Sequence, residues 1–193
     1  MGRRGQALLS GVNFTLQPGS SLAVIGESGC GKTTLLQTLA GVLPAVAGDV
    51  SCRSSESAGK PVNAIVWQNL ALFPWLTVAG NLALPLKLKK EYGIAERVRE
   101  MLAELELEGL ERRFPAALSG GQRQRIGIAR ALYRQADVLF FDEATSALDS
   151  RTEEEINRSI AGLAARDAGL TLVVIAHRES SLEYCNRIIT IGE

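Results

Sequence analysis

The sequence predicts an α/β domain with a mostly parallel central sheet flanked by helices, an antiparallel β edge near the N-terminus and a helical subdomain. Short, continuous apolar runs alternate along the chain with stretches of helical periodicity. Continuous runs, unlike alternating ones, are typical of parallel strands that are buried on both faces. The candidate strands are residues 21–26, 64–68, 136–143, 171–177 and 187–192.

Helical patterns fill the intervals between these runs. The predicted helices are residues 32–41, 94–107, 122–135 and about 150–166. Residues 11–16 (GVNFTL) alternate apolar and polar side chains, which predicts a half-exposed edge strand. Residues 69–135 hold no strong strand, so we expect one domain over 1–193 with a helical subdomain inserted at about 69–135.

The composition favours a neutral, soluble, cytosolic protein. Of the 193 residues, 46% are hydrophobic, and 21 basic residues balance 21 acidic ones, so no overall charge draws the chain to nucleic acid. The cysteines Cys30, Cys52 and Cys185 are odd in number and far apart, which argues against a disulfide framework or a structural zinc site. The sequence contains no apolar stretch long enough for a membrane helix.

A glycine-rich turn, GESGCGKTT, joins the strand at 21–26 to the helix at 32–41. It matches G-x-x-x-x-G-K-[ST] in the strand–turn–helix context that this phosphate-binding motif requires. Glycines let backbone N–H groups wrap a phosphate, and the helix N-terminus adds unpaired amides. Lys32 would contact the β- and γ-phosphates, and the Thr33 hydroxyl would ligate Mg²⁺. The predicted nucleotide-binding residues are Gly26, Glu27, Ser28, Gly29, Cys30, Gly31, Lys32, Thr33 and Thr34.

Polar side chains end three of the candidate strands. Asp142 and Glu143 follow the apolar run VLFF, and adjacent strand residues point to opposite faces. We therefore expect Asp142 to hold Mg²⁺ and Glu143 to polarise an attacking water, although a solvated strand end is the alternative. The only histidine, His177, ends the strand at 171–177, at the sheet edge where ligands bind in such folds. Gln68 ends the strand at 64–68 in the same way.

The segment LSGGQ, residues 118–122, places two glycines in the first turn of a helix. Each glycine costs about 1 kcal/mol relative to alanine. Ser119 and Gln122 form the S-x-x-Q pattern of a capping box. Gly120 and Gly121 leave amides exposed, so a phosphate can approach the positive end of the helix. An ordinary capped helix explains Ser119 and Gln122 but not both glycines.

The order of these motifs resembles the ATP-binding cassette (ABC) ATPase domain. The matching elements are GESGCGKTT, the strand-end Gln68, LSGGQ, VLFFDE, SALD and the strand-end His177. LSGGQ some twenty residues before the acidic strand is specific to that family, and the resemblance covers nearly the whole chain. It implies a P-loop NTPase fold, with ATP and Mg²⁺ as cofactors. It also implies that two cassettes pair head to tail, so that Ser119, Gly120, Gly121 and Gln122 of each close over the ATP held by the other.

The resemblance also assigns roles to the polar strand ends. Glu143 would be the general base, and His177 would be the switch residue that contacts the γ-phosphate. Gln68 would reach Mg²⁺ or the attacking water and sense a membrane partner. Asp149, in SALD, would lie in a loop that crosses the dimer interface.

The implied protein is a Mg²⁺-dependent ATPase subunit at the cytoplasmic face of the cell membrane. Its partners would be transmembrane permease subunits, a second cassette (a homodimer) and, for some systems, a solute-binding protein; no nucleic acid is expected. Residues 73–86 would border the groove that receives the permease, with Phe73, Trp75 and Leu76 as a docking surface or, equally, as core filling. The motifs resemble importers in one region and exporters in another, so the direction of transport stays open.

Two departures and two alternatives accompany this interpretation. The aromatic residue that usually stacks on adenine would fall within MGRRG, where Arg3 or Arg4 is the available substitute, and both ends of the cassette look shortened. A soluble cassette acting on nucleic acid or ribosomes is one alternative. The local positive charge that would support it comes from one helix, but such charge is more typical of a solvated helix face. The residues are Arg123, Arg125, Arg130 and Arg134. A small-molecule kinase is the other, but it would have no use for LSGGQ.

Overall fold

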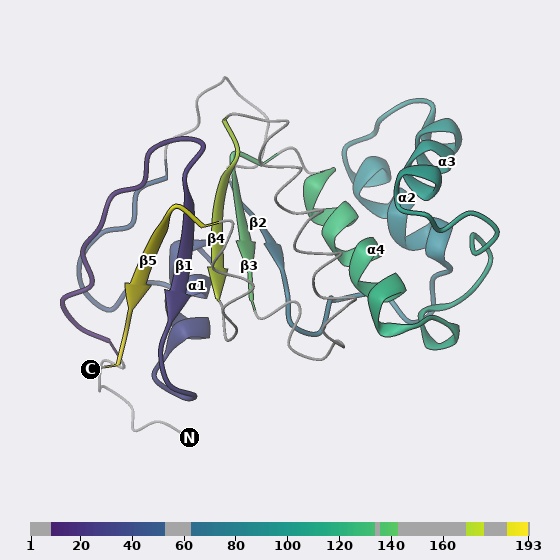
Figure 1. Cartoon of the computed structure of the whole chain (residues 1–193). Coiled ribbons are helices and arrows are strands. Elements are labelled where there is room, and N and C mark those ends of the chain that lie inside the picture. The colour runs from purple at the N-terminus through teal and green to yellow at the C-terminus, as the bar shows by residue number, and fades with distance from the viewer. Residues whose placement is uncertain (1–8, 53–62, 134–135, 143–168, 176–184, 193) are drawn as a thin grey trace.

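A parallel sheet, with five strands in the part of the chain that the structure describes, organises the fold (Figure 1). The computed structural model describes residues 9–52, 63–133, 136–142, 169–175 and 185–192. The strands are β1 (Ser21–Ile25), β2 (Asn63–Val66), β3 (Val138–Phe141), β4 (Thr171–Ile175) and β5 (Arg187–Thr190). Their order across the sheet is β2-β3-β4-β1-β5, and every neighbouring pair is parallel. All five carboxyl ends therefore lie at one edge of the sheet, which is where ligands bind in such folds.

Helices cover both faces of this sheet. Successive strand residues point to opposite sides, so an apolar strand has side chains to bury on each face. Phe140 packs in a cluster with Leu36 of helix α1 (Lys32–Leu39). Its neighbour Phe141 packs in a second cluster with Ile128 of helix α4 (Gly120–Leu132). The apolar runs of β1, β3 and β4 are thus buried on both faces, as the predicted parallel sheet requires, whereas β5 at the sheet edge is mostly exposed.

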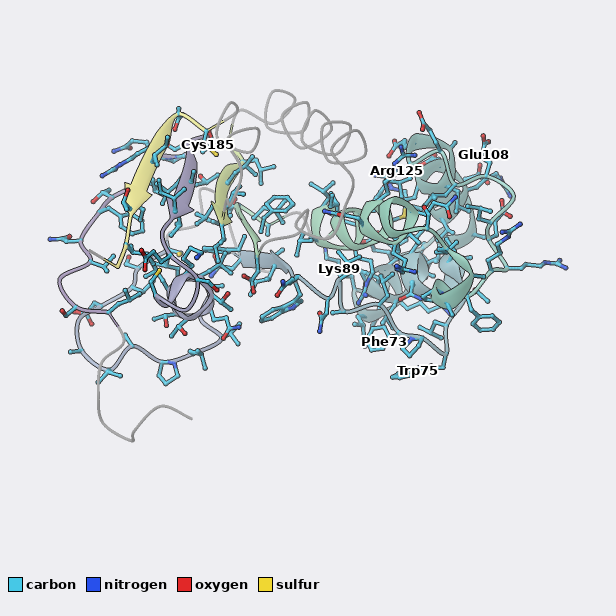
Figure 2. All side chains as sticks on the ribbon, turned by 60° about the horizontal axis from the view of Figure 1, so that its bottom comes forward. Phe73, Trp75, Lys89, Glu108, Arg125 and Cys185 are labelled. Atoms are coloured by element: carbon cyan, nitrogen blue, oxygen red, sulfur yellow. The ribbon has the colours of Figure 1, made fainter. Side chains whose placement is uncertain are left out.

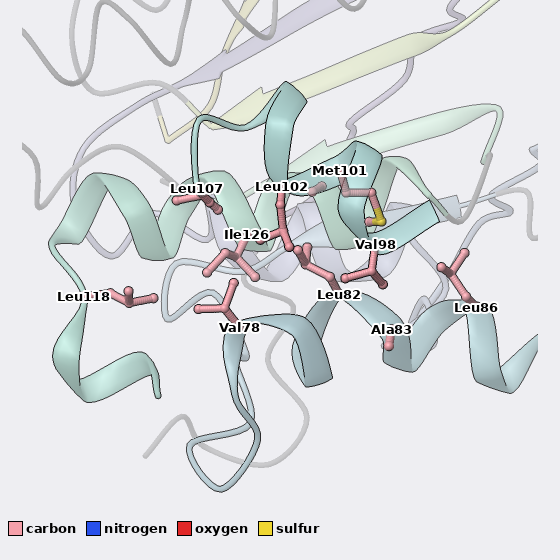
Figure 3. Packing of buried hydrophobic residues seen from close by; sticks show 11 residues of the cluster. Val78, Leu82, Ala83, Leu86, Val98, Met101, Leu102, Leu107, Leu118 and Ile126 are labelled. Carbon is pink, nitrogen blue, oxygen red and sulfur yellow. The ribbon is translucent and has the colours of Figure 1, made fainter. Parts of the chain in front are cut away.

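A separate group of helices lies beyond the β2 edge of the sheet (Figure 1). It contains α2 (Val78–Leu88), α3 (Ile94–Glu104), the short 3₁₀ helix η1 (Pro115–Ala117) and α4. A hydrophobic cluster of its own holds it together, and Figure 3 shows side chains from α2, α3 and α4 meeting at its centre. Met101 and Ile126 are fully buried there. Within the described part of 69–135 the chain forms these helices and no strand.

The structure corrects the prediction for residues 11–16, which form no strand. Phe14 and Leu16 pack against the cluster that contains α1, and the Thr15 carbonyl accepts a hydrogen bond from Arg187 Nη1 at 2.7 Å. The alternating pattern therefore marks a segment with one partly buried side, which contacts the sheet through side chains and not through strand pairing. Within the described residues, the sheet has no antiparallel edge.

One of the α-helices contains a proline. Helix α2 continues through Pro85. The buried side chains of α2, such as Leu82 and Leu86, hold it in the helical cluster despite the missing N–H of Pro85. The predicted helix at 150–166 lies outside the described residues. None of the helices in the described ranges combines the length and apolar character that a membrane span needs.

Candidate nucleotide-binding site

The glycine-rich turn leaves the carboxyl end of β1 and leads into α1. Gly26 has φ +155°, and a Cβ built on it would lie 2.3 Å from the Ile191 carbonyl oxygen. Gly31 caps the N-terminus of α1 in the left-handed region, at φ +105°. Only glycine fits both positions without strain. The turn therefore takes its shape from glycines at its first and last positions, as the motif predicts.

The ammonium group of Lys32 lies inside this turn. Its Nζ donates to the carbonyl oxygens of Gly26 at 2.9 Å and Glu27 at 2.8 Å, and the residue is only 4% exposed. None of the ion pairs between described residues includes Lys32. A buried positive charge whose partners in this part of the chain are neutral carbonyls attracts an anion.

The first turn of α1 adds to this attraction. No side chain caps α1, and its first turn contains no acidic residue. Its N-terminal amides are therefore available to an anion together with the positive end of the helix dipole. Because α1 starts at Lys32 itself, the ammonium group and the helix N-terminus would attract an anion bound at the same place.

A hydroxyl and a carboxylate meet beside Lys32. Thr33 Oγ1 donates to Asp142 Oδ1 at 2.9 Å, across 109 positions of the chain. Asp142 follows β3 directly, and its main-chain N–H extends the ladder by donating to the Val66 carbonyl at 3.0 Å. At 4% exposure the carboxylate is buried at the carboxyl edge of the sheet. Thr33 and Asp142, two of the three residues predicted as metal ligands, are thus in contact.

The remaining residues of the turn contribute mainly backbone. Glu27, Ser28 and Gly29 form its exposed apex. The half-buried Cys30 side chain instead packs toward Gly192, where an added Cβ would lie 2.6 Å from Cys30 Cβ. Thr34 is half-buried in the first turn of α1.

The LSGGQ segment forms the start of α4 as predicted. Ser119 is the N-cap, and its Oγ accepts from the Gln122 N–H at 3.2 Å while Gln122 Oε1 accepts from the Ser119 N–H at 3.0 Å. Gly120 and Gly121 are the first two helical residues. Helix α4 lies beyond β2, whereas α1 lies beside β1 and β4 (Figure 1). Within one chain, the LSGGQ segment (the signature, residues 118–122) and the glycine-rich turn (the phosphate loop, residues 26–34) therefore lie in different parts of the molecule.

Gln68 lies two residues after the end of β2, so the strand is shorter than the predicted 64–68 and does not include it. It is exposed, and it introduces a turn in which Leu70 and Ala71 both have positive φ, at +58° and +44°. Glu143, His177 and Asp149 lie outside the described residues. Of the predicted site, the structure therefore brings together Lys32, Thr33 and Asp142 at the sheet edge.

The predicted docking surface is only partly exposed. Trp75 is 70% exposed and projects from the helical part (Figure 2), whereas Phe73 and Leu76 are half-buried. The rings of Phe73 and Trp75 are 5.4 Å apart. Trp75 alone therefore fits the expectation of an exposed aromatic side chain.

Sequence reasoning missed two residues that shape this region. Asn81, in the apolar stretch NLALPL, is fully buried and makes four hydrogen bonds to the main chain of residues 73–77. Arg130, expected on a solvated face, stacks on the Phe73 ring at 5.0 Å. Asn81 could have been noticed as a polar residue at a helical position that is otherwise apolar. No pattern in the sequence distinguishes Arg130 from the other arginines of α4.

Known proteins share this arrangement. Residues 9–146 match the family described as ABC transporter. The chain is 39% identical over 194 residues to the spermidine/putrescine import ATP-binding protein PotA of Thermotoga maritima, covering 96% of this chain and 52% of that protein. The chain thus spans about half the length of this curated relative.

A solved structure gives the same result for the fold. It is the dimeric post-hydrolysis state of the ATP-binding cassette MJ0796 bound to ADP and Pi, with a TM-score of 0.81 and 31% identity. The match covers 96% of this chain and 86% of that one. The glycine-rich turn, the capped LSGGQ helix, the family match and this likeness agree: the chain belongs to the ABC transporter family and has the P-loop fold of its ATPase cassettes.

Proposed function

We propose that the chain is the Mg²⁺-dependent, ATP-binding and ATP-hydrolysing subunit of an ABC transporter. Residues 1–193 form one cassette, with the helical subdomain at about 69–135. The observation that carries this proposal is the buried Lys32 ammonium group in a glycine-rich turn at the carboxyl edge of a parallel sheet. A triphosphate entering there would meet a positive charge and a helix N-terminus together.

Lys32 is held ready for a phosphate rather than for a protein carboxylate. Its two carbonyl partners fix the ammonium group inside the turn. Phosphate oxygens are stronger acceptors than carbonyls because their charge strengthens each hydrogen bond. The Lys32 ammonium group and the amides of residues 28–34 would therefore supply most of the affinity for the β- and γ-phosphates of ATP.

Thr33 and Asp142 fit a Mg²⁺ ion. Mg²⁺ takes oxygen ligands and is usually held by one or two protein groups plus substrate phosphates. A hydroxyl and a buried carboxylate in contact provide such oxygens beside the phosphate turn. Mg²⁺ bound there would neutralise negative charge on the phosphates, with Gln68 as a further ligand.

The catalytic roles fall to residues beyond the strand ends. We propose that Glu143 accepts the proton of the attacking water and that His177 contacts the γ-phosphate. Gln68 would orient the water or Mg²⁺. Its place shortly after β2 puts it at the same sheet edge as Asp142, which follows β3, because these strands are parallel neighbours.

A second copy would complete each site. Gly120 and Gly121, beside the capping residues Ser119 and Gln122, present helix N-terminal amides on α4, away from the phosphate turn of their own chain. Head-to-tail pairing of two copies would bring each signature over the ATP held by the other. The dimeric state of the related cassette supports this arrangement. ATP binding would then drive dimerisation.

The remaining partners follow from the family and from the printed role of the relative. We propose a transmembrane permease as the membrane partner and the cytoplasmic face of the membrane as the location. Because PotA of Thermotoga maritima is an import ATP-binding protein, import is favoured over export, and a solute-binding protein would deliver the solute. The neutral charge balance gives no reason to expect a nucleic acid partner.

The test compares two lysine variants. Lys32→Met keeps the length of the side chain but removes the charge, and we expect it to weaken MgATP binding by about a hundredfold, as loss of two charge-assisted contacts implies. Lys89→Met is the matched control, because Lys89 also donates to a main-chain carbonyl, that of Tyr133 at 3.1 Å, but lies in the helical part (Figure 2). Calorimetric titration measures both. Equal affinities for the two variants would contradict the proposed site.

A further inference from the structure

One arginine of α4 is tied to the turn that follows Gln68. Arg130 Nη1 donates to the Ala71 carbonyl at 2.6 Å, and its guanidinium group lies 5.0 Å from the centre of the Phe73 ring. Arg130 is half-buried, and burial lowers the pKa of its guanidinium below the ordinary value. None of the ion pairs between described residues includes it. Among the described residues, its partners are thus a carbonyl and an aromatic ring of one segment.

That segment has a backbone conformation that is unfavourable by itself. Leu70 and Ala71 are consecutive residues with positive φ, although neither is glycine, asparagine or aspartate. Such conformations persist where surrounding contacts determine them. Two local hydrogen bonds, from Leu70 N–H to the Trp67 carbonyl at 2.8 Å and from Ala71 N–H to Asn69 Oδ1 at 3.2 Å, close the turn but do not attach it to α4.

Helix α4 supplies the attachment at two points one turn apart. A Cβ built on Gly127 would lie 3.2 Å from Leu70 Cδ2, so this glycine lets Leu70 approach the helix closely. Arg130, three residues further along, holds the carbonyl of Ala71. Because residues three apart lie on the same side of a helix, Gly127 and Arg130 contact the strained turn from one face of α4.

We propose that Arg130 is a positioning residue that holds residues 69–73 against α4, so that Gln68 and the signature at 119–122 shift together. The coupling is mechanical, because α4 is one continuous helix with the signature at its first turn and Arg130 in its last. A displacement of the Gln68 turn therefore acts on the whole helix as long as Arg130 is attached. The effect of this contact on ATP-driven dimerisation rests on the proposed function. The attachment of residues 69–73 to α4 does not.

The attachment is tested in the nucleotide-free protein by amide hydrogen exchange. The reporters are the hydrogen-bonded N–H groups of Leu70, Ala71 and Phe73. We expect Arg130→Met to speed their exchange by about tenfold, because loss of the anchor favours local opening. Arg130→Lys, which keeps a cation and one donor, should give a smaller increase.

The matched control is Arg97→Met in helix α3. Arg97 also stacks on an aromatic ring, that of Tyr133 at 4.9 Å, and its hydrogen bond among the described residues goes to Glu100 rather than to the turn at 69–73. It should leave the three amides unchanged. Phe73→Leu is a second variant that removes the ring beneath Arg130, and it should also speed exchange. Equal exchange in Arg130→Met, Phe73→Leu and Arg97→Met would overturn the inference.

The functional consequence is measured in a Glu143→Gln background by crosslinking with increasing MgATP. Adding Arg130→Met should raise the ATP concentration for half-maximal dimer about tenfold, while the affinity for MgADP stays within about twofold. Unchanged dimerisation together with faster exchange would overturn the coupling. If Glu143→Gln alone forms no dimer, the proposed function fails instead, and exchange in the monomer still decides whether Arg130 holds the turn.

Discussion

Thr33→Val removes one hydroxyl from the centre of the proposed site with little change in shape. Valine is close to threonine in size and in helix propensity. The lost hydrogen bond, from Thr33 Oγ1 to the buried Asp142 carboxylate at 2.9 Å, is of a kind that contributes about 1.5–3 kcal/mol. For a domain of this size that loss lowers the midpoint of thermal unfolding by roughly 3–12 °C.

The same substitution should weaken nucleotide binding only when Mg²⁺ is present. If Thr33 Oγ1 is a metal ligand, its loss reduces the affinity gained from Mg²⁺ by at least about tenfold, the scale seen for groups that support a metal site. ATP affinity in EDTA should stay the same, because Lys32 and the loop amides remain. Calorimetric titrations with Mg²⁺ and with EDTA measure the difference.

Thr38→Val is the control for this experiment. Thr38 lies in the same helix, and its hydroxyl donates only to the Thr34 carbonyl among the described residues, at 2.8 Å. The substitution should cost less than about 1 kcal/mol and leave the effect of Mg²⁺ intact, since a neutral local hydrogen bond contributes little. A Thr33→Val protein that keeps the full Mg²⁺ effect would refute the assignment of Thr33 as a metal ligand.

Three other substitutions test the phosphate turn, the helical part and the proposed catalytic role of His177 separately. Gly26→Ala places a methyl group 2.3 Å from the Ile191 carbonyl oxygen, so MgATP binding by titration should fall by at least about tenfold; unchanged binding would show that the loop adapts. Asn81→Leu removes four hydrogen bonds to residues 73–77 and should lower the free energy of unfolding in urea by about 2–4 kcal/mol, whereas a loss below about 1 kcal/mol would count against its role. His177→Ala should slow single-turnover hydrolysis by about a hundredfold or more with ATP binding retained; normal hydrolysis would leave His177 a structural strand-end residue.

The sheet and the phosphate turn could be predicted because their signals are local. Continuous apolar runs mark strands buried on both faces, and the spacing of Gly26, Gly31 and Lys32 determines the turn between β1 and α1. The capping box of Ser119 and Gln122 is equally local. These predictions depend on residues within a few positions of each other, where backbone geometry leaves few alternatives.

Contacts between distant segments were harder to predict. The alternating residues 11–16 indicate one buried side, but the sequence does not say whether a main-chain partner is present. Arg130 lies among other arginines, and only the fold brings the Phe73 ring under it. The contact between Thr33 and Asp142 could be foreseen because each belongs to a motif whose chemistry requires the other.

The central claim is that ATP joins two copies of this chain so that each signature completes the other's site. Glu143→Gln removes the proposed base while leaving Lys32, Thr33 and Asp142 in place. Light scattering coupled to size-exclusion chromatography, supported by crosslinking, then measures the mass of the variant with saturating MgATP and with MgADP. We predict a dimer with MgATP that is lost when Ser119→Arg blocks the signature. A protein that remains monomeric with bound MgATP in both assays would contradict the claim.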